Sequence, residues 1–205
     1  MADTSTPTNE ADTTDPDDRT MWDMLMTTWR ELNVPKGWRA EIPGEYITMT
    51  PPPGKEHGLI AARIHRALAG ATPKGCASFE APAVHLIPSN RLYTPDLVIM
   101  PEDDPSISVD DDTLPISAEH AALVVEIAAR PGTDHDREDR RRAYAGARVP
   151  LYLVVDRWGA YGPEVALHFE PNGRFHQRIH RVSFGRSIAL PEPFGIDLDT
   201  SDFPG

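Results

Sequence analysis

The chain has 205 residues, of which 20 are basic and 32 are acidic, and its formal net charge is −12. This length suits a single domain whose core needs no disulfide or structural metal, and the single cysteine, Cys76, excludes an intramolecular disulfide framework. The excess of acids argues at first against a nucleic-acid partner, because phosphate contacts depend on Lys and Arg.

The acids are concentrated in two segments. Residues 1–19 hold six acids and one base, and residues 101–112 hold six acids and no base. The rest of the chain has 20 acids and 19 bases, so it permits nucleic-acid binding without predicting it. Residues 1–19 also almost lack apolar side chains, which predicts a disordered acidic tail ahead of one domain over residues 20–205. Because no stretch resembles a membrane span or a signal peptide, we expect a cytoplasmic protein that does not enter a membrane.

The sequence predicts a helix, a β-hairpin and a second helix in the first half of the domain. Thr20 is the predicted N-cap of the first helix, and strands at residues 38–42 and 45–49 flank a Pro-Gly turn. Residues 51–54, Pro-Pro-Pro-Gly, predict an extended break before a second helix over residues 56–69. The expected apolar faces are Trp22, Leu25, Met26, Trp29 and Leu32 in the first helix, and Leu59, Ile60, Ile64 and Leu68 in the second.

Four apolar runs predict the strands of one sheet, at residues 84–87, 97–100, 121–127 and 151–155. The last two lack polar alternation, as strands do when both faces are covered. A charged helix at residues 136–147 lies between them and predicts a parallel crossover.

The end of the chain predicts a second hairpin. Residues 164–169 and 175–182 flank an Asn-Gly turn, and we expect the alternating His and Arg side chains there, including His168 and His176, to face solvent. The whole order predicts an α/β fold in which a mixed central sheet is flanked by helices, with β-hairpins near both ends.

Two acids stand in apolar surroundings. Asp96 directly precedes the run 97–100, and Glu126 lies near the end of the run 121–127. A carboxylate among buried apolar residues is costly unless it is paired, hydrogen-bonded or bound to a metal. Hard carboxylate oxygens on adjacent strands suit Mg²⁺ or Mn²⁺, although either acid alone could be a strand-end residue that faces solvent or caps a neighbour.

These residues and their spacing resemble the Uma-two family of restriction endonucleases, within the PD-(D/E)XK nuclease superfamily. The similarity covers about residues 38–200. Its motifs are Glu41 to Glu45, Met49 to Pro53, His57-Gly58, Thr94-Pro95-Asp96, Val124 to Ala128, Asp136, Arg140 and Tyr144 at intervals of four, and Val149 to Asp156.

The resemblance implies a restriction-endonuclease-like fold and a metal-dependent endonuclease that hydrolyses phosphodiester bonds, with DNA as the expected nucleic acid. Asp96, Glu126 and the backbone carbonyl of Ile127 would bind Mg²⁺ or Mn²⁺, which polarises a phosphoryl oxygen and lowers the pKa of a bound water. It also implies a homodimer.

The chain departs from the family pattern at the catalytic Lys. The superfamily's simple Lys position is Ala128, and the family's displaced position on the following helix is Arg140. Arginine stays protonated and differs from Lys in shape. Two alternatives follow: an active endonuclease that uses Arg140, or a catalytically degenerate nuclease fold that binds DNA or another protein. A small-molecule phosphoesterase is a third.

Three further candidates each have a functional and a structural interpretation. Glu41 is a third metal ligand or a surface acid of the hairpin. His57 contacts the site from the start of the second helix or makes a structural hydrogen bond. Tyr144 lies on the same helix face as Arg140, where it either contacts the site or, as is more typical, packs in the core. The run Arg140 to Arg142 either grips phosphates or forms a solvated helix face with i,i+4 pairs.

Overall fold

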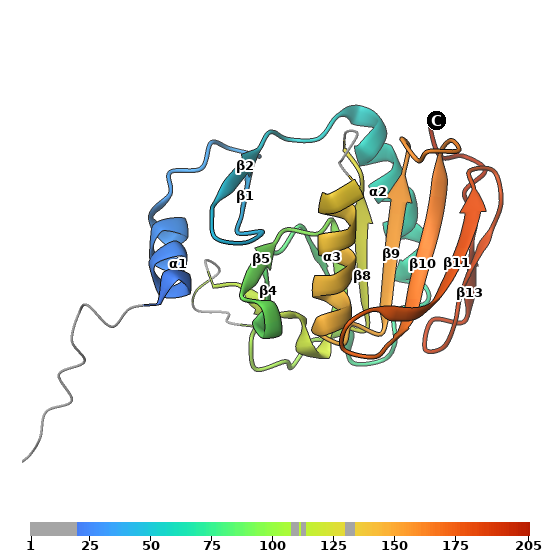
Figure 1. Cartoon of the computed structure of the whole chain (residues 1–205). Helices are drawn as coiled ribbons and strands as arrows, with labels where there is room; N and C mark the ends of the chain where they lie inside the picture. The colour runs from blue at the N-terminus through green and yellow to red at the C-terminus, as the bar shows by residue number, and fades with distance from the viewer. Residues whose placement is uncertain (1–19, 108–110, 112–113, 130–133) are drawn as a thin grey trace, which may run out of the picture.

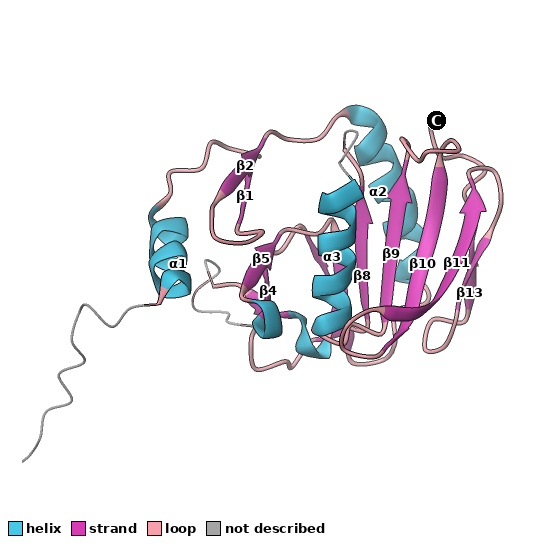
Figure 2. Ribbon diagram, viewed as in Figure 1, coloured by secondary structure: helices cyan, strands magenta, loops and turns pink. Residues whose placement is uncertain are grey.

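The structure is a computed structural model that describes residues 20–107, 111, 114–129 and 134–205. The tail expected at residues 1–19 lies outside these residues. In the described part of the chain, a six-stranded mixed sheet has the order β11-β10-β9-β8-β6-β3. Figure 1 shows helix α3 in front of this sheet and α2 behind it, and Figure 2 shows the smaller strand groups around it. No described helix is long and apolar enough to cross a membrane.

The helices are α1, Met21–Glu31, α2, Lys55–Ala69, and α3, Asp134–Gly146. The central strands are β3, Cys76–Glu80, β6, Leu97–Pro101, β8, Leu123–Ile127, β9, Leu151–Asp156, β10, Glu164–Pro171, and β11, His176–Ser183. The smaller sheets pair β1, Arg39–Glu41, with β2, Thr48–Thr50, and β12, Ile188–Leu190, with β13, Ile196–Leu198. A third joins β5, Arg91–Tyr93, β4, Val84–Leu86, and β7, Ile116–Ser117, and short 3₁₀ turns lie at η1, Ile87–Ser89, and η2, Ala118–His120.

Most of the predicted elements are confirmed. The side chain of Thr20 caps α1 in a reciprocal capping box with Asp23. The N-terminal and C-terminal hairpins form as β1–β2 and β10–β11. Strands β8 and β9 are parallel neighbours joined through α3, and the other pairs of the central sheet are antiparallel, so the sheet is mixed as expected.

Alternation along the strands divides the core into two layers. One layer packs against α2 and the other against α3. The α2 layer includes Ile60, Ile64, Leu68, Leu97, Ile99, Val125, Ile127 and Leu153, and the α3 layer includes Val98, Met100, Val124, Ala143, Tyr144 and Tyr152. The two acids of interest stand where these layers reach the end of the sheet.

Two predictions were wrong, one about the strands of the central sheet and one about the buried face of α2. The run predicted at residues 84–87 forms β4, which pairs with β5 and β7 instead of the central sheet. The edge of the central sheet is β3, whose half-buried residues carry no apolar run. On α2, Leu59 is 50% exposed, because His57, Ile60, Ile64 and Leu68 form the buried face.

The expectation for the terminal hairpin also fails at two histidines. His168 and His176 are buried, although many of their neighbours on β11 are exposed. Strand β10 lies between β9 and β11, so His168 is covered by the rings of Tyr152 and His176.

The buried face of α2 provides a test of stability. We expect Ile60→Ala to lower the free energy of unfolding by about 2–5 kcal/mol, because Ile60 is fully buried and leaves a cavity. Leu59→Ala on the same helix should change it by less than about 0.5 kcal/mol. Urea denaturation followed by circular dichroism measures both, and equal losses would contradict this assignment of the two faces.

Candidate active site

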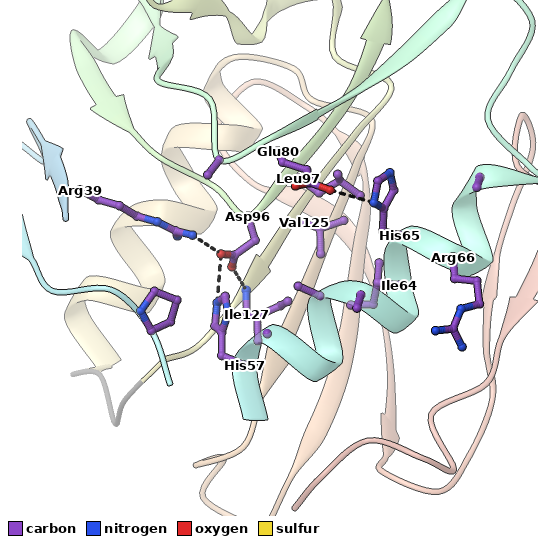
Figure 3. Close-up of a pocket in the computed structure, with 16 residues that line it drawn as sticks. Arg39, His57, Ile64, His65, Arg66, Glu80, Asp96, Leu97, Val125 and Ile127 are labelled. Atoms are coloured by element: carbon purple, nitrogen blue, oxygen red, sulfur yellow. Dashed lines mark hydrogen bonds and ion pairs between the residues drawn. The ribbon is translucent and has the colours of Figure 1, made fainter. Parts of the chain in front are cut away.

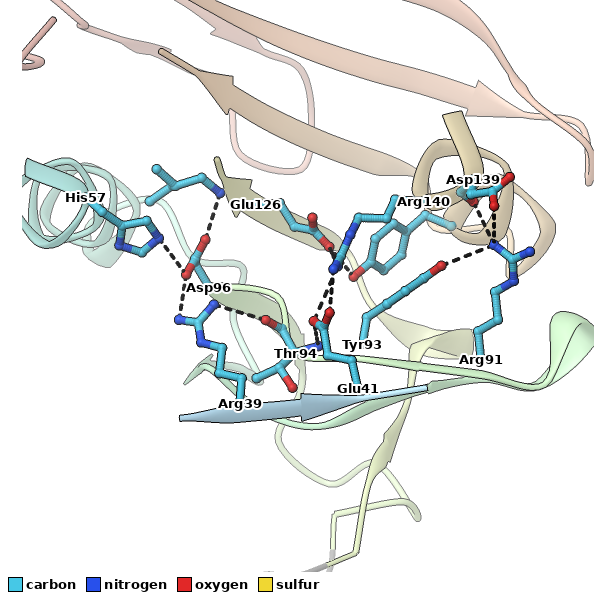
Figure 4. Close-up of polar contacts among 12 residues, drawn as sticks. Arg39, Glu41, His57, Arg91, Tyr93, Thr94, Asp96, Glu126, Asp139 and Arg140 are labelled. Atoms are coloured by element: carbon cyan, nitrogen blue, oxygen red, sulfur yellow. Dashed lines mark hydrogen bonds and ion pairs between the residues drawn. The ribbon is translucent and has the colours of Figure 1, made fainter. Parts of the chain in front are cut away.

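Asp96 lies just before β6, at the end of the sheet, and its side chain is only 5% exposed. Its Oδ2 accepts a hydrogen bond of 2.7 Å from the backbone N–H of Ile127. Its Oδ1 accepts from Nη2 of Arg39 at 2.7 Å and lies 3.0 Å from Nε2 of His57 (Figures 3 and 4). Both oxygens of the carboxylate are therefore engaged, by β8, β1 and the first turn of α2.

These contacts hold Asp96 in its ionised form. Burial raises the pKa of this carboxyl, but the hydrogen bond from His57, the charge of Arg39 and the N–H of Ile127 together outweigh burial. The pKa of Asp96 therefore lies below its ordinary value, and the group is a carboxylate at neutral pH.

Glu126 points to the other face of the sheet, toward α3. Its Oε1 accepts from Nη1 of Arg140 at 3.0 Å and from the hydroxyl of Tyr144 at 2.8 Å. Arg140 also bonds through Nη2 to Oε2 of Glu41, whose Oε1 accepts from the backbone N–H of Thr94 at 2.8 Å. One guanidinium thus bridges two carboxylates from strands that are distant in the sequence (Figure 4).

The electrostatics of Glu126 oppose those of Asp96. Burial raises the pKa of Glu126, Arg140 lowers it, and the nearby carboxylates of Glu41 and Asp96 raise it again, so the net shift is upward. Burial lowers the pKa of Arg140, but Glu126 and Glu41 raise it well above the ordinary value. Arg140 is therefore a fixed positive charge. Burial and the charge of Glu126 raise the pKa of Tyr144, which stays a hydrogen-bond donor.

Arg140 is also held by an aromatic ring. Its guanidinium carbon lies 4.3 Å from the centroid of the Tyr93 ring, a cation–π contact. The hydroxyl of Tyr93 accepts from Nη1 of Arg91 at 3.1 Å, and Arg91 lies 3.7 Å from a carboxylate oxygen of Asp139 on α3. Strand β5 thereby fixes the position of Arg140 from the side opposite β8.

The carboxylates open into a cleft of about 760 Å³, whose walls include Asp96, Glu126, Glu41 and Arg140. A second groove of about 520 Å³ runs along α2 and shares the wall formed by Asp96 and Arg39 (Figure 3). Asp96 thus stands between a cleft on the α3 face and a groove on the α2 face.

The structure brings the predicted candidates to one end of the sheet. Tyr144 is fully buried, as expected of a packing residue, and its hydroxyl also bonds Glu126. Arg142 is exposed and pairs with Glu138 at 2.8 Å, as the solvated-face interpretation expects, whereas Arg141, which bonds the same glutamate at 3.1 Å, is only partly exposed. Each candidate ligand already has a cationic partner, and within the described residues no three Asp, Glu, His or Cys side chains cluster closely enough to hold a metal ion.

The sequence analysis missed Arg39 and Tyr93. Arg39 is two residues before Glu41, so both side chains lie on the same face of β1 and reach the site together. This spacing of two residues could have identified Arg39 from the sequence. Tyr93 directly precedes the motif Thr94-Pro95-Asp96, but its contact with Arg140 depends on the pairing of distant elements.

The opposite shifts predict opposite pH profiles of stability. Because its pKa is lowered, Asp96 stabilises the fold above its ordinary value of 3.8, and this contribution is lost as the pH falls through the folded pKa. Asp96→Asn should therefore cost about 1–3 kcal/mol at neutral pH and progressively less in acid.

Glu126→Gln should behave in the reverse way. Because the pKa of Glu126 is raised, wild type loses stability relative to this variant as the pH rises above 4.5. Urea denaturation of both variants from pH 3 to pH 8 measures the two profiles. Parallel profiles for the two variants would contradict the assigned shifts.

Comparisons with known proteins identify the family of this chain and the fold that it shares. A family model described as "Uma2: Putative restriction endonuclease" matches residues 27–201. No curated protein matches the chain. A crystal structure described as a "putative nuclease belonging to DUF820" from Anabaena variabilis ATCC 29413 aligns with a TM-score of 0.65 and 12% identity, covering 87% of this chain and 96% of that chain. This likeness shows a shared nuclease-like fold, and the family match confirms the resemblance found in the sequence: the chain belongs to the Uma2 restriction endonuclease family.

Proposed function

We propose that the protein is a metal-dependent endonuclease that hydrolyses phosphodiester bonds in DNA, with Asp96 and Glu126 as metal ligands and Arg140 in the place of the catalytic Lys. The observation that carries this proposal is the position of Arg140, fixed against Glu126 in the wall of a cleft that also contains Asp96. Membership of the family supports nucleic acid as the substrate.

The donor atoms are of the kind that a hard divalent ion binds, and the carboxylates would have to move closer together to hold one. Asp96, Glu126 and Glu41 supply carboxylate oxygens, and the charges of Arg39 and Arg140 leave this group net negative when His57 is neutral. Among the described residues, no hydrogen bond is made to Oε2 of Glu126, so an ion could bind this oxygen directly. Both oxygens of Asp96 are engaged, so Asp96 would have to release a contact to bind the ion. A bound Mg²⁺ or Mn²⁺, with the carbonyl of Ile127 and with Glu41 as further candidate ligands, would polarise a phosphoryl oxygen and activate a water.

The protein's own residues have separate tasks in this proposal. Arg140 stays protonated, so it stabilises negative charge on the phosphate and does not accept a proton. Tyr144 orients Glu126, whereas Glu41 and Tyr93 orient Arg140. Arg39 and His57 keep Asp96 ionised and in place.

One observation favours the alternative of a catalytically degenerate fold that binds DNA or another protein. Asp96, Glu126 and Glu41 are each paired with an arginine of the same chain, with Arg140 serving both glutamates, which is also how an inactive site would be stabilised. An ion that binds here competes with these arginines. The two functions therefore differ in whether the carboxylates exchange a guanidinium for a metal.

The nuclease function predicts that purified protein nicks supercoiled plasmid DNA when Mg²⁺ or Mn²⁺ is added. Asp96→Ala and Glu126→Ala should each lower the rate at least about 100-fold, because a ligand is lost. Glu102→Ala is the matched control: this exposed acid follows the opposite end of β6 and should leave the rate unchanged. Gel electrophoresis of the plasmid measures the rate.

Calorimetry with Mg²⁺ or Mn²⁺ separates the two functions. Wild type that neither cleaves DNA nor binds the ion would leave the degenerate fold as the function. Gain of cleavage in Arg140→Lys would also indicate a degenerate site, whereas loss of cleavage would identify Arg140 as the working cation. The homodimer stays a prediction, which light scattering after gel filtration tests. The cytoplasmic location also stays a prediction.

A further inference from the structure

The cleft continues from Glu126 across the sheet to its edge. Glu126 pairs with Val154 of β9, Val154 pairs with Ala166 of β10, and Ala166 pairs with Arg181 of β11. Directly paired residues lie on the same face of a sheet, and all four line the same cleft. With strands about 4.8 Å apart, the Cα atom of Arg181 is roughly 14 Å from that of Glu126. Ala166, whose side chain is small, lines the cleft between them.

Two arginines at the far end of this path have unused donors. Arg181 is half exposed, and its contact with Glu164 is loose, with Nε 3.8 Å from Oε1. Arg141, on α3, bonds to Glu138 through Nη2 at 3.1 Å, but its Nε is buried without a hydrogen-bond partner among the described residues. A buried N–H without a partner is costly, so this donor is expected to serve a ligand.

His168 lies beside these arginines in the next row of the sheet, paired with Tyr152. It lines the cleft, is 3% exposed and has no hydrogen bond within the part of the chain that the structure describes. Burial and the nearby charges of Arg141, His176 and Arg181 lower the pKa of His168 to about 3, so the ring is neutral. A neutral imidazole offers one donor and one acceptor.

Acidic side chains also line this part of the cleft, and they have cationic partners. Asp156 lies 2.8 Å from Nη2 of Arg137, and Glu164 faces Arg181. A ligand can use the donors of Arg141, Arg181 and His168 without breaking the close ion pair between Asp156 and Arg137.

We propose that Arg141, Arg181 and His168 form a subsite for a backbone phosphate of the nucleic-acid strand. This inference rests on the proposed function, in which the same strand is cleaved beside Glu126. Guanidinium groups bind phosphate oxygens through paired, charge-assisted hydrogen bonds. One strand of DNA carries a phosphate every 3.4 Å or so of helix axis, so roughly 14 Å corresponds to a few nucleotides from the cleaved bond. The strand crosses the sheet from β8 to β11 along the cleft, past the N-terminal half of α3.

The test measures binding without cleavage. Fluorescence anisotropy follows a labelled 20-base-pair duplex and its single strand with the full chain in EDTA, over a series of salt concentrations. Arg141→Gln and Arg181→Gln should each weaken binding and reduce the slope of log K against log salt by about one, as expected for one lost phosphate contact.

Arg178→Gln is the matched control on the same strand. Arg178 pairs with Phe169, so it lies on the opposite face of the sheet, where it stacks 5.1 Å from the Phe169 ring and bonds Glu170 at 3.1 Å. This variant should keep the wild-type slope. His168→Phe keeps the stacked ring but removes both nitrogens, so it should weaken binding about three- to tenfold without changing the slope.

The outcomes separate the subsite from the proposed function. Wild-type slopes in both Arg141→Gln and Arg181→Gln would overturn the subsite, even in a protein that cleaves DNA. Reduced slopes in a protein that never cleaves would support the subsite and reject the nuclease function. A folded wild type that binds neither the duplex nor the single strand would overturn the subsite, and the plasmid assay with added metal then decides the nuclease function separately. Thermal unfolding of each variant shows that it is folded.

Discussion

Three carboxylates, from β1, from the residue before β6 and from β8, meet at one end of a sheet whose two core layers are apolar. Their charge has to be balanced locally, because water is largely excluded there. Arg39 and Arg140 supply this balance, and removal of either partner of such a pair leaves an uncompensated buried charge. The positions of the β1–β2 hairpin, of Thr94 and of α3 all follow from this requirement, whereas the apolar layers against α2 and α3 supply the bulk of the stability.

The balance is not uniform across the site. Asp96 accepts hydrogen bonds from Arg39 and Ile127, lies against the His57 ring and is held ionised, whereas Glu126 shares one guanidinium with Glu41 and has a raised pKa. One acid is therefore already in the form that a metal ion requires, and the other gives up a proton more reluctantly. The two candidate ligands look equivalent in the sequence but are chemically different in the fold.

The sequence was informative wherever a local pattern determines the structure. The capping residue Thr20 and the crossover at β8, α3 and β9 were predicted correctly. The apolar runs also drew attention to Asp96 and Glu126, whose role as ligands stays a proposal. Pairing between distant segments was not predictable in this way. An apolar run at β4 does not specify its partner strand, β3 has no apolar run, and burial of His168 depends on rings from β9 and β11.

The three residues of β1 connect the two halves of the site. Arg39 and Glu41 point to the same side of this strand, one toward Asp96 and the other toward Arg140. A shift of β1 by one residue against β2 would turn both side chains away at once. An insertion or deletion in this hairpin during evolution would therefore remove a positive and a negative partner together. The site is expected to be inherited, or lost, as a whole.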